Sequence, residues 1–337
     1  MNKKRSAPTM KDVAQEAGVA LGTVSKVFNG LPVGESYKKR VEAAAQKLGY
    51  QVNNYARGLR ASRTNTVAVI LPSVNHAFFG MLAEYLCRFL MARGQRTLLA
   101  TTNLNPGVEQ ECVNMVQQNK VDGIIGLTYH PDLQFDESVP FVSIDRPFNP
   151  KVPCVSSDNY GGGQLAAQKL AELGCKRLLV FQQTGTTPGE VDKRRMGFEA
   201  WCTAHGVEHT IVHVYEGENS WETFWSFLEE HMTGEAPEYD GLFCGSDHLA
   251  YHTCEKLREL GVKVPEQVQV IGYDGLQLFG FEEEDYYCST IAQPVKAMAE
   301  TAVDLLLNPD RSRLPALVCL PVEYRMGKTT RDWKKKS

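Results

Sequence analysis

The chain opens with three short stretches in which apolar residues recur every three to four positions, the spacing of one helix face. Gly18 separates the first two stretches, and glycine tolerates the left-handed backbone of a tight turn. A third stretch runs from about Glu35 to Leu48 and ends at Gly49. The spacing predicts three helices, of which the first two form a helix-turn-helix. Their core should hold Met10, Val13, Ala14, Ala17, Val24, Val27, Phe28, Val41, Ala44, Ala45 and Leu48.

From Thr66 onward, short apolar runs alternate with amphipathic stretches. This alternation predicts parallel β-sheets with helices on both faces, an α/β fold. About 265 residues exceed what one sheet of ordinary size needs, so we expect two lobes. The runs are VAVIL, TLLAT, GIIGL, FVSI, LLVF, TIVHVY, GLFCG and VQVIGY. The amphipathic stretches lie near 78–93, 107–119, 161–173, 192–205, 220–232, 247–260 and 294–307.

The net charge also differs between the three predicted N-terminal helices with the segment after them and the α/β part of the chain. Residues 1–63 carry a net charge of +8, and the rest of the chain carries −12. A small basic head on an acidic body indicates that only the head binds a polyanion such as DNA. The alternative, a solvated basic tail, would not carry the apolar spacing found here.

Composition narrows the class of protein further. Hydrophobic residues make up 43% of the chain, which is ordinary for a globular protein, and no apolar run approaches a membrane span. The basic N-terminus lacks the apolar region of a secretion signal. The nine cysteines form no C-x-x-C pair and favour reduced thiols in a cytoplasmic protein.

The segment KDVAQEAGVALGTVSKVFNG resembles the start of the LacI/GalR family of transcription regulators, and the likeness runs over nearly the whole chain. It implies a helix-turn-helix domain at 1–52, a hinge at 53–63 and an effector-binding and dimerisation domain at 64–330. That domain would have two Rossmann-like lobes of the periplasmic-binding-protein type. Their expected extents are 64–159 with 292–320, and 160–291 with 321–330.

The resemblance also implies how the chain would bind DNA. A homodimer would place its second helices in successive major grooves of a pseudo-palindromic double-stranded operator, with Leu21, Gly22 and Lys26 at base edges. Phosphate contacts would fix the register without reading sequence. They are expected from Thr9, Thr23, Ser25, Asn29 and Asn53.

The polar segment QVNNYARGLRASRTNT has too few apolar residues to fold alone. In the family this position holds a hinge helix that forms on DNA and inserts a leucine into the minor groove. Leu59 matches that wedge, with Asn53, Ala56 and Arg57 at neighbouring hinge positions. A flexible linker is the alternative, and Gly58 favours it because glycine costs about 1 kcal/mol in a helix.

Polar and aromatic residues follow the predicted strands, at the sheet edge where α/β proteins bind ligands. Carboxylates, a guanidinium and aromatic rings suit a polyhydroxylated ligand. The resemblance makes these loops specific through R-x-x-G-F at Arg194, the aspartate Asp274 after VIGY, and the loop Asn75–Phe79. The expected effector contacts are Ser73, Asn75, Phe79, Asp145, Asp158, Arg194, Asn219, Trp221, Asp247 and Asp274.

Catalysis finds little support in the sequence. His248 and His252 have helical spacing but no evident third metal ligand, and Gly327-Lys328-Thr329 lacks the earlier glycine of a phosphate loop. We therefore expect no enzyme, metal or cofactor. The predicted function is a DNA-binding regulator, more specifically a repressor, switched by a sugar or sugar derivative. The alternatives are a cytosolic sugar-binding protein without regulatory role, and a regulator that responds to a nucleobase stacked on Phe79.

Overall fold

The structure, a computed structural model, describes residues 8–28, 31–50, 64–130, 132–184, 189–215, 220–233, 236–277 and 286–332. It divides into two compact units, Met1–Thr64 and Asn65–Ser337. We call the first the head. The second contains two β-sheets.

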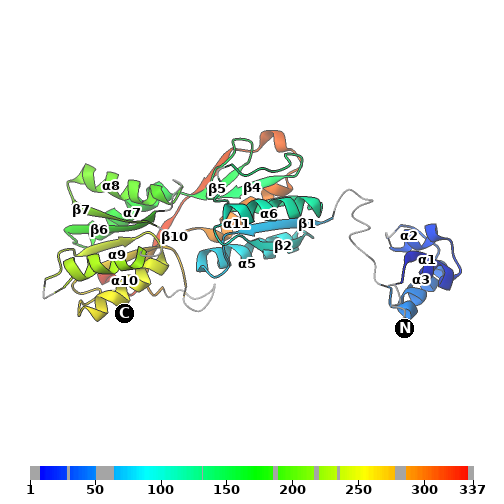
Figure 1. The fold of residues 1–337 in the computed structure, drawn as a ribbon, viewed down its shortest axis with the longest axis horizontal. Coiled ribbons are helices and arrows are strands. Elements are labelled where there is room, and N and C mark those ends of the chain that lie inside the picture. Colours follow the sequence, from blue (N-terminus) through cyan, green and yellow to red (C-terminus); the bar gives the residue numbers. More distant parts are fainter. Residues whose placement is uncertain are drawn as a thin grey trace. The chain divides into compact units, whose positions relative to one another are not determined.

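The head consists of α1 (Met10–Ala17), α2 (Leu21–Phe28) and α3 (Glu35–Leu48), drawn in blue in Figure 1. Thr9 caps α1 with a capping box, in which Thr9 and Asp12 satisfy each other's backbone N–H. Gly18 ends the helix in a left-handed conformation with φ of 60°, as predicted. The core contains the predicted residues, with Val13, Val24 and Val41 fully buried.

Arg40 ties α3 to the turn between the first two helices. Its Nη2 donates to the carbonyl oxygens of Ala17 and Gly18 at 2.6 and 2.9 Å. These two carbonyls lie at the end of α1, where the helix cannot satisfy them itself. The guanidinium therefore fixes the angle at which α2 leaves the turn.

The first sheet, which we call the N-lobe with its helices, is entirely parallel and has the order β11-β5-β4-β3-β1-β2. Helices α5 (Ala77–Ala92) and α11 (Val295–Leu307) pack on one face, and α6 (Pro106–Gln118) covers the other. The strands are β1 (Thr66–Leu71), β2 (Arg96–Thr101), β3 (Gly123–Gly126), β4 (Phe141–Ile144), β5 (Cys154–Ser157) and β11 (Leu317–Leu320).

The second sheet, the C-lobe with its helices, has the order β12-β10-β9-β8-β6-β7, and only β12 runs antiparallel. One face carries α7 (Asn159–Glu172) and α8 (Asp192–His205), and the other carries α9 (Ser220–His231) and α10 (Asp247–Glu259). The strands are β6 (Arg177–Thr184), β7 (Glu208–Tyr215), β8 (Gly241–Cys244), β9 (Gln269–Asp274), β10 (Ser289–Ala292) and β12 (Glu323–Arg325).

The chain passes between the lobes three times, after β5, after β10 and after β11 (Figure 1). All eight apolar runs of the sequence form strands, and the seven amphipathic stretches form helices within a few residues of the predicted bounds. Four short strands, β5, β10, β11 and β12, were not among those runs. Three of them, with the sequences CVSS, STIA and EYR, contain polar residues, so no continuous apolar run marks them.

Helices α7 and α8 approach each other without side chains between them. A Cβ added to Gly163 would overlap the backbone carbonyl of Arg194, and one added to Gly197 would overlap that of Tyr160. Glycine at these two positions lets the helix backbones touch, which fixes the position of α8.

We expect Gly163→Ala to destabilise the C-lobe by about 1–3 kcal/mol, because the new methyl group must push α8 away. Helix propensity alone predicts the opposite sign, a gain of about 1 kcal/mol. Urea unfolding measures the difference. Gly245→Ala is the matched control, since its Cβ would meet only an ordinary 3.6 Å contact with Phe181 O. Equal stability of the two variants would contradict the close packing.

Candidate functional site

The outer surface of α2 presents the residues that the sequence predicts at base edges. Leu21 is 43% exposed, and Gly22 and Lys26 are also exposed. Val24, between them, is fully buried in the head. One side of α2 thus packs in the core of the head, and the opposite side is accessible to a binding partner.

The other predicted DNA contacts are less uniform. Thr23 and Ser25 are half-buried, and the Thr9 hydroxyl donates to Asp12 Oδ2 at 2.7 Å within its capping box. The remaining predicted contacts lie outside the described residues. They are Asn29, Asn53, Ala56, Arg57 and Leu59.

Arg194 is the centre of a buried polar cluster where the lobes meet. Its side chain lies at the start of α8 and is 5% exposed. The guanidinium donates to Asn159 Oδ1 and to Gly245 O, each at 2.7 Å. It lies 3.7 Å from the centroid of the Tyr273 ring, and its Nη1 is 3.6 Å from Asp274 Oδ1. One cation therefore joins α7, α8 and the ends of β8 and β9.

The N-lobe enters this cluster through Asp145, which follows β4 and adopts a positive φ of 55°. Its Oδ1 accepts hydrogen bonds from Ser156 Oγ at 3.0 Å and Asn159 Nδ2 at 3.1 Å. Burial raises the pKa of the Asp145 carboxyl, and Arg194 partly opposes that shift. Asn159 bridges Asp145 to Arg194 and so links the lobes.

A second bridge lies at the crossing after β10. Gln293 donates from Nε2 to Asp274 Oδ1 at 2.8 Å and accepts at Oε1 from Ser157 Oγ at 2.7 Å. Burial raises the pKa of Asp274, while Arg194 and His76 lower it. Both bridging amides, Asn159 and Gln293, therefore stand where the chain passes between lobes.

Asp247 supports the loop after β9. Its Oδ2 accepts from the backbone N–H of Gly275 at 2.9 Å and of Leu276 at 2.7 Å. Burial and the neighbouring Asp274 raise the pKa of Asp247 well above its ordinary value.

Four buried polar atoms in this region have no hydrogen-bond partner among the described residues. They are His76 Nδ1, Asp247 Oδ1, Tyr273 OH and Asp274 Oδ2. Leaving a buried polar group unpaired costs about 1–3 kcal/mol, so such atoms need an explanation. Two are carboxyl oxygens, which can accept hydrogen bonds, and the others belong to a phenol and an imidazole.

Aromatic side chains from both lobes lie next to the cluster. His76 contacts Phe79 with ring centroids 4.9 Å apart and ring planes tilted by 43°, and its ring lies 6.3 Å from that of His248 of the C-lobe. His248 is 5.9 Å from Trp221. Phe78, by contrast, is buried in the N-lobe core. Burial, with help from His252 and His76, lowers the pKa of His248, which favours the neutral ring.

The predicted effector contacts fall into three groups. The structure brings together Asp145, Arg194, Asp247 and Asp274, with Phe79 and Trp221 in the aromatic row. Asp158 caps α7 by accepting from Gly161 N, and Ser73 accepts from the backbone N–H of the exposed Asn75. Asn219 lies outside the described residues.

The prediction did not include several members of the cluster: Asn159, Gln293, Ser157, Tyr273, His76 and His248. A usable signal existed for Asn159 and Gln293, because each lies one or two residues after a strand at a lobe crossing. His76 and His248 lie beside predicted contacts, but a lone histidine in a loop carries no distinct pattern. Among the described residues, no three His, Cys, Asp or Glu side chains gather as metal ligands, and no helix could span a membrane.

Two family models match the chain. One, for bacterial regulatory proteins of the lacI family, covers residues 9–53. The other, for periplasmic binding proteins and the sugar binding domain of the LacI family, covers residues 64–306. The chain belongs to the LacI family.

Similar proteins match over nearly their whole length. The sucrose operon repressor of Streptococcus mutans is 32% identical and covers 95% of this chain and 98% of its own. The ribose operon repressor of Bacillus subtilis is 31% identical, with 96% and 98% covered. A structure of the regulator CelR with cellobiose has a TM-score of 0.66 at 28% identity, with 96% and 99% covered. The lac repressor dimer on its operator has a TM-score of 0.78 at 20% identity, again with 96% and 99% covered.

These findings confirm the predicted fold class, a helix-turn-helix head followed by two lobes of periplasmic-binding-protein type. They also confirm the prediction of a DNA-binding transcription regulator, because this LacI-family chain contains both parts of such a regulator.

The raised pKa of Asp247 predicts that the stability of the protein depends on pH. In the unfolded chain its carboxyl ionises near the ordinary value of 3.8, whereas the folded chain keeps the proton to higher pH. Stability should therefore fall as pH rises above about 4, until the folded carboxyl ionises. Asp247→Asn removes this contribution, so its urea midpoint should fall less between about pH 4 and pH 8. Asp132→Asn, an exposed change, is the control. An unchanged slope in Asp247→Asn would contradict the shift.

Proposed function

We propose that this protein is a sugar-responsive repressor that binds a pseudo-palindromic operator as a homodimer. The main support for a sugar effector is the set of buried polar atoms without partners around Arg194. Sugar hydroxyl groups both donate and accept, so they suit unpaired carboxylate, phenol and imidazole atoms. The aromatic row of Phe79, His76, His248 and Trp221 supplies surfaces for the C–H face of a sugar ring.

The relatives support the same class of effector. Their names refer to sucrose and ribose operons, and CelR was solved with cellobiose. The cluster contains carboxylates from both lobes and one guanidinium that already has several partners. This balance favours an uncharged polyhydroxylated molecule.

The proposed switch follows from the position of the cluster. Arg194 and its partners join both lobes at two of the three crossings, so a ligand here changes how the lobes meet. Such a ligand shifts the operator-binding state only by its difference in affinity for the two states, typically about 1–3 kcal/mol. The protein would act by binding and not by catalysis, in the cytoplasm where its DNA lies. Homodimerisation would use α5, through Met81, Tyr85, Arg88 and Phe89.

The first test is selection of bound DNA from a random pool at about 150 mM salt, followed by titration of the selected complex with sucrose, ribose, cellobiose and guanine. We expect a pseudo-palindrome whose affinity one of the sugars changes. A response to guanine alone would favour the nucleobase alternative. Weak binding without sequence preference, lost steeply with salt, would contradict the repressor assignment.

We expect Asp274→Asn to keep operator affinity but lose most of the sugar response. The change removes the carboxylate whose Oδ2 lacks a partner while keeping its volume. Losing a hydrogen bond to a charged group should weaken the sugar about tenfold or more. Glu199→Gln, at a half-buried position on the same helix as Arg194, is the control, because Glu199 pairs with Arg195 and not with the cluster. A normal sugar response in Asp274→Asn would place the effector elsewhere.

A second prediction concerns the head. A Cβ on Gly22 would meet nothing within 4 Å, so Gly22→Gln should not lower stability, and it should place an amide on the DNA-facing surface. Repeated selection should then show a changed base preference, worth about 1–3 kcal/mol at one position. Gly18→Ala is the contrasting variant. Its φ is +60° and its Cβ would lie 2.8 Å from Arg40 Nη2, so it should destabilise the head. An unaltered preference in Gly22→Gln would show that this position faces away from the bases.

A further inference from the structure

The start of α2 presents three consecutive exposed residues whose side chains have no hydrogen-bonding group. They are Ala20, Leu21 and Gly22. In a helix-turn-helix protein, this end of the second helix contacts the edges of base pairs in the major groove. Polar side chains usually read those edges, because each base pair presents its own pattern of donors and acceptors there. The side chains at the start of α2 cannot form such hydrogen bonds.

Leu21 is the large apolar side chain of this group, and the head does not use it as core. It is 43% exposed, and it is not part of the apolar cluster that contains Val13, Val24 and Val41. Val24, on the same helix, is fully buried. Leu21 therefore keeps apolar surface in water, and a partner that covers this surface gains free energy.

Gly22 leaves open space next to Leu21 on the helix surface. A Cβ at this position would meet nothing within 4 Å, so no other group of the head fills the space. A glycine lets a ligand approach the backbone closely. The bases can therefore come near enough to α2 for the short side chain of Leu21 to touch them.

Lys26 is the remaining exposed residue of α2, whereas Thr23 and Ser25 are half-buried. Its ammonium donates hydrogen bonds but accepts none. It can bind acceptors such as guanine O6 and N7, but it cannot accept from the amino groups of adenine or cytosine. The exposed side chains of α2 thus include no acceptor, so they cannot recognise an A·T pair through the adenine amino group.

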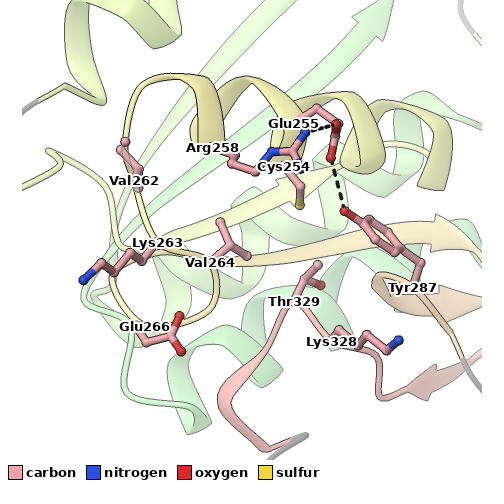
Figure 2. Close-up of a pocket in the computed structure, with 11 residues that line it drawn as sticks. Cys254, Glu255, Arg258, Val262, Lys263, Val264, Glu266, Tyr287, Lys328 and Thr329 are labelled. Atoms are coloured by element: carbon pink, nitrogen blue, oxygen red, sulfur yellow. Dashed lines mark hydrogen bonds and ion pairs between the residues drawn. The ribbon is translucent and has the colours of Figure 1, made fainter.

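The C-lobe contains a cavity of about 440 Å³ beside α10, but its polar groups are already engaged. Figure 2 shows Tyr287 and Arg258 both directed at Glu255, with contacts of 3.4 and 2.5 Å. A ligand that used these groups would have to break their contacts. A base that packs on Leu21 breaks no contact of the core of the head.

We propose that Leu21 recognises the 5-methyl group of a thymine in each operator half-site. This methyl group is the apolar group that a base pair presents in the major groove, and an aliphatic side chain packs on it without hydrogen bonds. Leu21 would thus select thymine by its methyl group. The proposal rests on the proposed binding of a pseudo-palindromic operator, and it names the chemistry by which one position of that operator is read.

The test uses the full chain and the operator selected from the random pool. Each thymine of the half-sites is replaced in turn by uracil, which lacks only the methyl group. At one position we expect uracil to weaken binding about fourfold, the contribution of one buried methyl group, and about fifteenfold when both half-sites carry it. Uracil outside the half-sites should have no effect. Fluorescence anisotropy at about 150 mM salt measures the affinities.

A methylated cytosine separates the methyl group of thymine from its carbonyl oxygen. At the same position, a C·G pair keeps the methyl group in the major groove only if the cytosine carries it at C5. We expect the operator with 5-methylcytosine to bind about fourfold more tightly than the operator with cytosine.

Two leucine variants assign the contact to a residue. In Leu21→Ala, the preference for thymine over uracil should fall from about fourfold to below about twofold. Leu31→Ala is the matched control, because Leu31 is 54% exposed on the same head but lies outside α2. It should keep the full preference. Melting curves show whether both variants fold.

Specific operator binding without any thymine that is sensitive to uracil would overturn this proposal and leave the proposed repressor function intact. The proposal also fails if a folded Leu21→Ala keeps the full preference, if Leu31→Ala loses it, or if methylation of the cytosine has no effect. Weak binding without sequence preference would overturn the proposed function itself, and base recognition by Leu21 with it.

Discussion

The buried guanidinium of Arg194 contacts two C-lobe groups, Asn159 and Asp274, that connect to the N-lobe. Asn159 bonds directly to Asp145, and Asp274 connects through Gln293 to Ser157. A cation in an apolar interior is costly unless charged and polar partners surround it. Here Asp274 and the oxygens of Asn159 and Gly245 provide that environment. Removing the guanidinium would leave two buried acceptors, Asn159 Oδ1 and Gly245 O, without their donor, so the loss of one side chain would disturb the whole network.

In this network, the residues that connect the two lobes lie at the points where the chain crosses between them. Asn159 and Gln293 follow strands of different sheets, and their amides each hydrogen-bond to side chains of both lobes. An amide donates and accepts at the same time, so Asn159 connects a carboxylate to a guanidinium, and Gln293 connects a carboxylate to a hydroxyl, without adding charge. The polar atoms that remain unpaired therefore face a junction that is already positioned, as a preorganised ligand site requires.

Sequence patterns predicted the fold well because the elements are long or strongly periodic. The head followed from the apolar faces around Val13, Val24 and Val41, and the lobes from alternating runs and amphipathic stretches. Strands β5, β10 and β12 were missed because their polar residues interrupt any apolar run, whereas the equally short β3, β4 and β8 are mainly apolar. Within the site, the family resemblance led to Arg194 through R-x-x-G-F and to Asp274 through the aspartate after VIGY. The proximity of His76 and His248 depends on how two lobes meet, which a sequence period does not encode.

The glycine contact between α7 and α8 has a consequence for how such a regulator can diversify. Gly163 and Gly197 leave no room for a side chain, so the frame that holds Arg194 tolerates little substitution. His76, Trp221 and His248 stand on loops or helix ends around that frame, away from the glycine contact. Substitution of these aromatic residues can therefore change the ligand preference while the packing of α7 on α8 stays the same. The residues that hold the lobes in place therefore differ from the residues whose exchange would change the preferred ligand.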